Sequence, residues 1–307
     1  INQLTIVLGI LITNLFNYLL AGNGTEVWRW MFGLGVVPSA LFLLGVLFLP
    51  ESPRWLYKAN RRQEANLILA KIGSSEYVSY TVGEIGKTVH SNSPVSYSAV
   101  FSKAVRPAVI VGITLAVFQQ LCGINVVFNY TSTIFKSVGA NLDKQLFETV
   151  AIGIVNTLFT LLAMWQVDKL GRRPLMLIGS LGLSVIYVIL AVLLNQQAAA
   201  GWISVFVLLA IGIYATSLAP VTWVLISEIF PNQIRGVASS VAIVSLWIAY
   251  FILVFTFPIL AEHLGTYGPF YLYAGICFLG FLFIRKKVAE TKGQSLEQME
   301  QTFAGHK

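Results

Sequence analysis

Eight long apolar runs constrain the fold more than any other feature of this sequence. A hydrocarbon core about 30 Å thick requires roughly 20 mostly apolar helical residues to cross it, and each run is about that long. The composition agrees, because 56% of the residues are hydrophobic and only 11% are charged. The expected spans are residues 1–20, 29–49, 106–128, 146–167, 174–194, 202–226, 236–260 and 267–285.

Helices are the secondary structure that fits these runs. Backbone polar groups in lipid must be hydrogen-bonded within their own segment or within a closed barrel. The runs do not show the alternation of polar and apolar residues that barrel strands require. The sequence therefore predicts an all-α membrane protein, with one long polar segment at about 50–105 between the second and third spans.

The positions of the basic residues indicate an orientation. Seventeen of the 20 lysines and arginines fall in the long polar segment up to Arg106, in alternate connections, or after the last span. The opposite loops hold only Arg29, Lys136 and Lys144. The positive-inside rule places the basic side in the cytoplasm. The net charge of +7 is thus explained by membrane orientation, and no nucleic-acid partner is expected.

The cysteines, the histidines and the first residue add three expectations. Cys122 and Cys277 lie in different apolar spans, where a small buried side chain is favoured over a disulfide or a metal ligand. All three histidines lie outside the spans, so we expect no metal site and no cofactor. The chain starts inside an apolar run without Met or a signal peptide, which is typical of a piece of a longer protein.

The stretch "QQLCGIN" (119–125) places three amides inside an apolar span. On a straight helix Gln119 and Gln120 lie about 100° apart and Asn125 about 240° from Gln119, so the amides would splay. Gly123 can break the helix and let them converge on a cavity, as in discontinuous transporter helices. Amides both donate and accept hydrogen bonds, which suits a neutral polyhydroxylated ligand.

Two other spans carry candidate ligand contacts. Pro220 removes a backbone donor and predicts a kink three residues before Trp223, whose indole can stack on a sugar ring. Asn156 is open to two interpretations, an interhelical hydrogen bond or a cavity ligand.

Acids and arginines recur together at the ends of the expected spans. The motifs are "PESPRW" (50–55), "DKLGRRP" (168–174), "SEIFPNQIRG" (227–236) and "AETKG" (289–293). Together with "QQLCGIN", in this order and spacing, they resemble the sugar porters of the major facilitator superfamily. Members have twelve spans, so the resemblance implies a major facilitator helical bundle with eight of the twelve helices present and the first four missing.

The resemblance also implies a division of the chain. Residues 1–49 would be the last two helices of the N-terminal bundle, and 50–105 a cytoplasmic helical linker. Residues 106–285 would form the C-terminal six-helix bundle, and 286–307 a cytoplasmic tail.

By the same resemblance, two groups of residues have expected roles. The sugar-contacting positions are Gln3, Gln119, Gln120, Asn125, Asn156, Trp223 and Trp247. The gating positions are Tyr130 on the outer side and the inner charge network of Asp168, Arg172, Arg173, Glu228 and Arg235. Leu246 and Asn129 depart from the family pattern, which favours a somewhat different pocket.

The expected function is that of a transporter and not of an enzyme. The chain is expected to move a monosaccharide, a hexose or a pentose, across the plasma (inner) membrane by alternating access, with proton symport. Glu228 is the only acid that we expect near an interior position, and it lies at the cytoplasmic end. Facilitated diffusion, a porter for a polyol such as inositol, and a sugar sensor with the porter fold stay open as alternatives.

Overall fold

The structure is a computed structural model that describes residues 2–21, 26–91, 100, 102, 105–230, 234–290 and 292. Nearly all of these residues are helical. Within the described residues, eight helical segments are long and apolar enough to cross a membrane, which confirms the expected all-α membrane fold and its eight spans. The eight segments are Gln3–Leu20, Val27–Leu47, Arg106–Asn129, Leu142–Val167, Arg172–Asn195, Ala200–Ser227, Arg235–Leu264 and Gly268–Lys287.

The chain forms two compact units, one of residues 1–23 and 97–307 and the other of residues 24–96. The first unit contains α1 (Asn2–Leu20), α7 (Arg106–Leu121), α8 (Ile124–Asn129), α9 (Thr131–Lys136), α10 (Leu142–Leu170), α11 (Arg172–Asn195), α12 (Ala200–Thr216), α13 (Leu218–Ile229), α14 (Arg235–Leu264) and α15 (Gly268–Lys287). The second contains α2 (Val27–Gly33), α3 (Val36–Leu47), α4 (Pro53–Lys58), α5 (Arg62–Ile72) and α6 (Ser75–Ser91).

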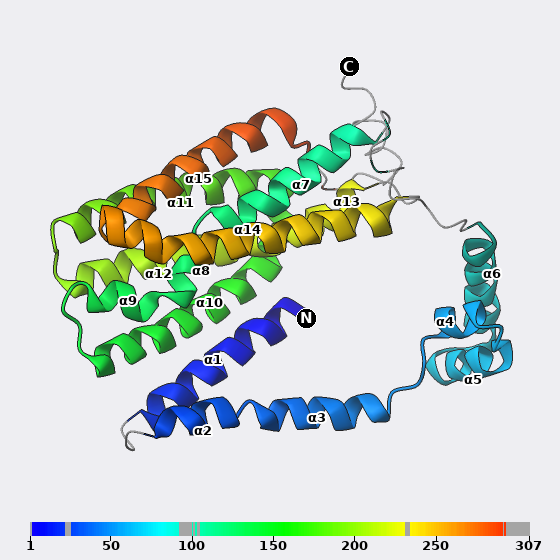
Figure 1. Ribbon diagram of the computed structural model, residues 1–307. Coiled ribbons are helices and arrows are strands. Elements are labelled where there is room, and N and C mark those ends of the chain that lie inside the picture. The colour runs from blue at the N-terminus through cyan, green and yellow to red at the C-terminus, as the bar shows by residue number, and fades with distance from the viewer. Residues whose placement is uncertain are drawn as a thin grey trace. The chain divides into compact units, whose positions relative to one another are not determined.

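The first unit is a helical bundle whose long members run side by side (Figure 1). α7 packs on α14, α11 on α15, and α10 on α12. α1, far away in sequence, lies along α10. The expected domain boundaries at 49, 105 and 285 stay predictions.

The second unit has a small packed part. Leu56, Ala65 and Leu69 are buried where α4, α5 and α6 meet. Arg61 forms an exposed ion pair with Glu64, and its hydrogen bond holds the pKa of the Glu64 carboxyl below the usual value. α3 buries none of its side chains.

The expected helix break inside "QQLCGIN" is present. α7 ends at Leu121, and α8 starts at Ile124 after Gly123, whose φ is +88°. Only glycine adopts this left-handed conformation readily. A Cβ at this position would also lie 2.5 Å from ring atoms of Tyr273 on α15. Gly123 thus provides both the turn and the close approach of two helices.

The helix break near Pro220 lies three residues earlier than expected. α12 ends at Thr216 and α13 begins at Leu218, with Ser217 between them in a non-helical conformation. Pro220 occupies the first turn of α13, where its missing N–H leaves no hydrogen bond unmade. The proline therefore starts the second half of the span, and Ser217 is the site of the bend.

We predict that Gly123→Ala destabilises the protein by about 2–5 kcal/mol, because the left-handed conformation and the contact with Tyr273 both penalise a methyl group. Thermal unfolding in detergent measures the change. Gly275→Ala is the matched control, since a Cβ on this glycine of α15 meets no atom within 4 Å. Equal unfolding midpoints for the two variants would contradict this role of Gly123.

Candidate functional site

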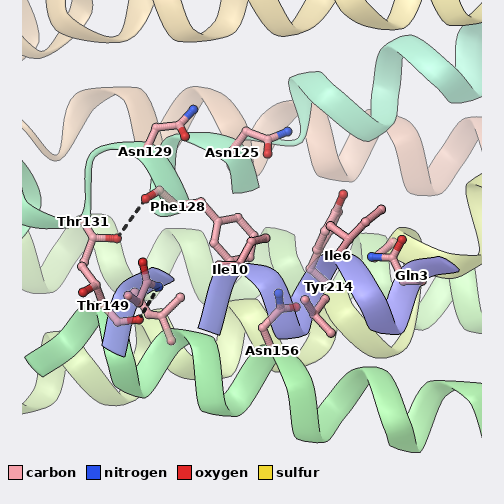
Figure 2. Close-up of a pocket in the computed structure, with 14 residues that line it drawn as sticks. Gln3, Ile6, Ile10, Asn125, Phe128, Asn129, Thr131, Thr149, Asn156 and Tyr214 are labelled. Carbon is pink, nitrogen blue, oxygen red and sulfur yellow. Dashed lines mark hydrogen bonds between the residues drawn. The ribbon is translucent and has the colours of Figure 1, made fainter. Parts of the chain in front are cut away.

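A cavity of about 390 Å³ lies in the first unit between α1 and the helices α8, α9, α10, α12 and α13 (Figure 2). Side chains from six helices therefore meet around one space. The lining residues are Gln3, Ile6, Val7, Ile10, Asn14, Asn125, Phe128, Asn129, Thr131, Thr149, Ile152, Asn156, Tyr214 and Ala219.

Three of the sequence-predicted residues line this cavity, namely Gln3, Asn125 and Asn156. They come from α1, α8 and α10, and Figure 2 shows them around the same space. Asn156 is only 5% exposed, and its side-chain amide makes no hydrogen bond with any described residue. A buried amide without a partner is costly unless water or a ligand satisfies it. The cavity is where such a partner can bind.

Gln119 and Gln120 are buried behind Asn125 and do not line the cavity themselves. The amide of Asn125 donates to Oε1 of Gln120 at 2.5 Å, and the amide of Gln120 donates to Oε1 of Gln119 at 3.4 Å. The side chain of Tyr214, from α12, lies near Gln119. The amides of "QQLCGIN" thus converge across the break at Gly123 in a chain that ends at the cavity.

The connection between α8 and α9 is tied to α14. Asn129 donates to the hydroxyl of Tyr250 at 2.9 Å, and the hydroxyl of Tyr130 donates to the carbonyl of Val254 at 3.0 Å. The ring of Tyr130 also packs on Phe257, with centroids 4.7 Å apart. Asn129 itself lines the cavity, so one departure from the family pattern lies in its wall. The gating role of Tyr130 stays a prediction.

The two predicted tryptophans do not line this cavity. Trp223 on α13 is 42% exposed and Trp247 on α14 is 58% exposed. Trp247 packs edge-on against Tyr250 at 5.6 Å. Leu246, the other departure from the family pattern, is buried in the core. Sugar contacts by the tryptophans stay predictions.

Several polar residues around the cavity were not assigned to it from the sequence. Asn14 on α1 donates to the carbonyl of Thr149 on α10 at 2.9 Å, which joins the first helix to the bundle. Tyr214 and Thr131 also line the cavity. Each is a polar residue in an apolar span, and this signal alone does not separate cavity residues from helix contacts.

Glu148 is a further residue that the sequence analysis passed over in favour of Glu228. It lies on α10 beside Thr149, is 5% exposed, and accepts a hydrogen bond from Ser204 of α12 at 2.5 Å. A carboxyl group inside the expected span 146–167 was the signal that could have identified it. The contact holds together two helices that line the cavity.

At the end of the bundle where α10 meets α11, Glu290 occupies the start of α11. Its carboxylate accepts the backbone N–H groups of Arg172 at 3.0 Å and Arg173 at 3.1 Å. Free N–H groups at a helix start favour an anion. Gly171 has a φ of +89°, and a Cβ there would lie 2.8 Å from Glu290. The positive φ favours glycine at this position.

The predicted charge network at this end is described only in part. The guanidinium of Arg173 donates to the carbonyl of Arg285 at 2.8 Å, and Nε of Arg235 donates to the carbonyl of Phe230 at 3.2 Å. The side chains of Asp168 and Glu228 lie outside the described residues. The ion pairs of the network therefore stay predictions.

Among the described residues, no cluster of three His, Cys, Asp or Glu side chains could hold a metal ion. Cys122 and Cys277 are free and buried, as the sequence predicted. The thiol of Cys277 lies 3.6 Å from the carbonyl of Cys122, so the two residues serve helix packing between α7 and α15.

Comparisons with known proteins give consistent results. The family model described as "Sugar (and other) transporter" matches residues 1–303. A putative metabolite transport protein of Bacillus subtilis is 40% identical over 305 residues, which cover 98% of this chain and 66% of that protein. A D-xylose–proton symporter of Escherichia coli is 36% identical over 312 residues, which cover 97% of this chain and 63% of that protein.

Solved structures of the major facilitator superfamily are similar as well. The inward-open xylose transporter of Escherichia coli matches with a TM-score of 0.82 and 33% identity, over 98% of this chain and 64% of that one. The proton:xylose symporter bound to 6-bromo-6-deoxy-D-glucose matches with a TM-score of 0.77 and 34% identity, over 98% and 66%. The chain spans about two thirds of the length of these relatives. It belongs to the sugar (and other) transporter family, with the fold of the major facilitator superfamily.

Proposed function

We propose that this protein is a secondary transporter that moves a monosaccharide across the membrane by alternating access. The observation that carries the proposal is the amide of Asn156, which is buried, opens on the cavity and has no partner among the described residues. A hydroxyl group of a bound sugar would satisfy this amide, since it both donates and accepts hydrogen bonds.

The chemistry of the cavity favours a neutral ligand with many hydroxyl groups. None of the 14 described lining residues carries a charge. Gln3, Asn125 and Asn156 offer amides, while Ile6, Ile10 and Phe128 offer apolar surface. A sugar ring has polar edges and apolar C–H faces, so it can use both kinds of wall. An anionic substrate would require a basic residue, which this wall does not contain.

The names of the relatives support a monosaccharide. They include a D-xylose–proton symporter of Escherichia coli, a glucose transporter of Staphylococcus epidermidis and an arabinose–proton symporter of Bacillus subtilis. Pentoses and hexoses are thus both proposed substrates. Because two of these names specify proton symport, we propose that protons drive uptake here too.

The proposed orientation places the end of the first unit where α10 meets α11 in the cytoplasm and Tyr130 on the outer side, with the protein in the plasma (inner) membrane. The excess of basic residues on one side of the spans supports this orientation. In the proposed cycle two bundles rock about the sugar. Tyr130 closes the outer side, and the inner charge network closes the cytoplasmic side. The members of this network are Asp168, Arg172, Arg173, Glu228 and Arg235.

Gln119 and Gln120 would act through Asn125 in this scheme. Their hydrogen bonds fix the orientation of the Asn125 amide, which frees its oxygen to accept from a sugar hydroxyl. Trp223 and Trp247 are proposed as further sugar contacts, because their exposed indole faces are accessible to a ligand.

We predict that Asn125→Ala or Gln119→Ala in the full-length protein lowers sugar uptake at subsaturating concentration by about 5- to 150-fold. Each substitution removes an amide and leaves its hydrogen-bonding partner buried and unpaired, which costs about 1–3 kcal/mol of binding free energy. Uptake of radiolabelled xylose and glucose by cells that express the variants measures the loss.

Asn195→Ala is the control for this experiment, because that asparagine is exposed at the end of α11. Membrane insertion of all variants is checked by immunoblot of the membrane fraction. Near-normal uptake by the Asn125 and Gln119 variants would refute the assignment of the cavity. Competition by inositol that exceeds competition by both sugars would favour the polyol porter instead.

Proton symport predicts that a protonophore abolishes accumulation of sugar above the external concentration, while exchange of internal for external sugar persists. The physical reason is that exchange needs the binding site but not the proton gradient. Uptake by the full-length protein with and without the protonophore measures this effect. Unchanged uptake would assign facilitated diffusion.

A further inference from the structure

The end of the first unit where α10 ends, α11 begins and α15 ends carries a large excess of positive charge. Residues 168–173 and 285–292, here called the basic end, contain seven basic residues and two acids. Cations therefore remain in excess even when both acids are ionised. The basic residues are Lys169, Arg172, Arg173, Arg285, Lys286, Lys287 and Lys292.

The carboxylate of Glu290 is engaged by backbone groups. It accepts N–H groups of Arg172, Arg173 and Lys292. Among the described side chains, no ion pair joins it to Lys169, Arg173 or Lys292. The start of α11 is thus already occupied by the Glu290 carboxylate. The side chains of Lys169 and Lys292 make other contacts.

The ammonium group of Lys292 contacts the backbone of Lys169, and the ammonium group of Lys169 contacts Trp165. Nζ of Lys292 donates to the carbonyl of Lys169 at 2.6 Å, which uses one of its three donors. No ion pair joins this ammonium group to a described acidic side chain. Nζ of Lys169 lies 3.7 Å from the ring centroid of Trp165, one turn earlier on α10. A ring face attracts the cation but leaves its N–H groups free to donate.

Trp165 indicates the environment of this pair. Its side chain is 61% exposed, on a helix face where Leu158 and Leu161 are exposed too, so this face of α10 is apolar and is not covered by the described residues. Tryptophans on such faces concentrate at the depth of the lipid headgroups. Lys169 stands above the ring, at the end of the span, where a long basic side chain reaches the headgroup layer.

We propose that Lys169, Lys292 and Trp165 form a binding site for the phosphate of an anionic phospholipid. The two ammonium groups would donate to phosphate oxygens, and the indole would pack against the glycerol and upper acyl chain. The other cations of the basic end add a longer-range attraction for the same headgroup. The ligand is a lipid, because the exposed apolar face of α10 continues directly below the lysines.

The test is a comparison of two lipids that differ in charge. Full-length protein in detergent micelles is titrated with phosphatidylglycerol or phosphatidylcholine, both with brominated acyl chains, and quenching of tryptophan fluorescence is recorded. The wild type should bind phosphatidylglycerol more tightly, and added salt should reduce the preference. Absence of any preference in the wild type would overturn the proposal.

In the variant Lys169→Gln with Lys292→Gln, the ratio of the affinity for phosphatidylglycerol to that for phosphatidylcholine should fall about 25-fold, about fivefold for each charge removed. Lys136→Gln with Lys144→Gln, two exposed lysines remote in sequence on α9 and α10, is the matched control and should keep it. Lys169→Arg with Lys292→Arg should also keep it, which separates loss of charge from misfolding. If the variant Lys169→Gln with Lys292→Gln kept the wild-type preference for phosphatidylglycerol, the proposed site would be wrong.

A third arm distinguishes the lipid from free phosphate. Inorganic phosphate is added to the wild type at constant ionic strength, and the lipid titration is repeated. Persistence of the phosphatidylglycerol preference supports the lipid site. Loss of the preference would assign the two lysines to a soluble phosphate and overturn the lipid assignment.

Discussion

The helix break between α7 and α8 depends on a single requirement, namely that polar groups inside a membrane must find hydrogen-bond partners. At Gly123 the backbone turns with a φ of +88°, which brings the amides of Gln119, Gln120 and Asn125 into one hydrogen-bonded chain. A straight helix would leave these amides on different faces, with some directed at lipid. The break thus satisfies the interior amides and gives Asn125 a fixed orientation at the cavity.

Neutral and charged polar groups are separated along the bundle. The cavity is lined by amides, hydroxyls and apolar side chains, without a charge among its described residues. Cations gather at the basic end, and Glu290 there fills the start of α11. Because a charge in the hydrocarbon region is costly, this separation supports the proposal that hydrogen bonds select a neutral ligand in the cavity.

The candidate site could be predicted from the sequence where polarity was dense or a motif was specific. "QQLCGIN" and its glycine led to the chain of amides, and Gln3 and Asn156 were identified through the resemblance to sugar porters. Single polar residues such as Asn14, Thr149 and Tyr214 could not be assigned in this way. A lone polar side chain in a span has the same sequence signal whether it contacts a helix or a ligand.

The sequence by itself determined the class of the protein, because hydrocarbon thickness and backbone hydrogen bonding leave only spanning helices for eight apolar runs. It also determined the position of one helix break, since only glycine turns readily there. The tertiary structure alone decided which polar residues share a cavity. Contacts such as Asn14 with Thr149 and Glu148 with Ser204 join helices far apart in the chain. Their geometry depends on helix packing, which local residue patterns do not encode.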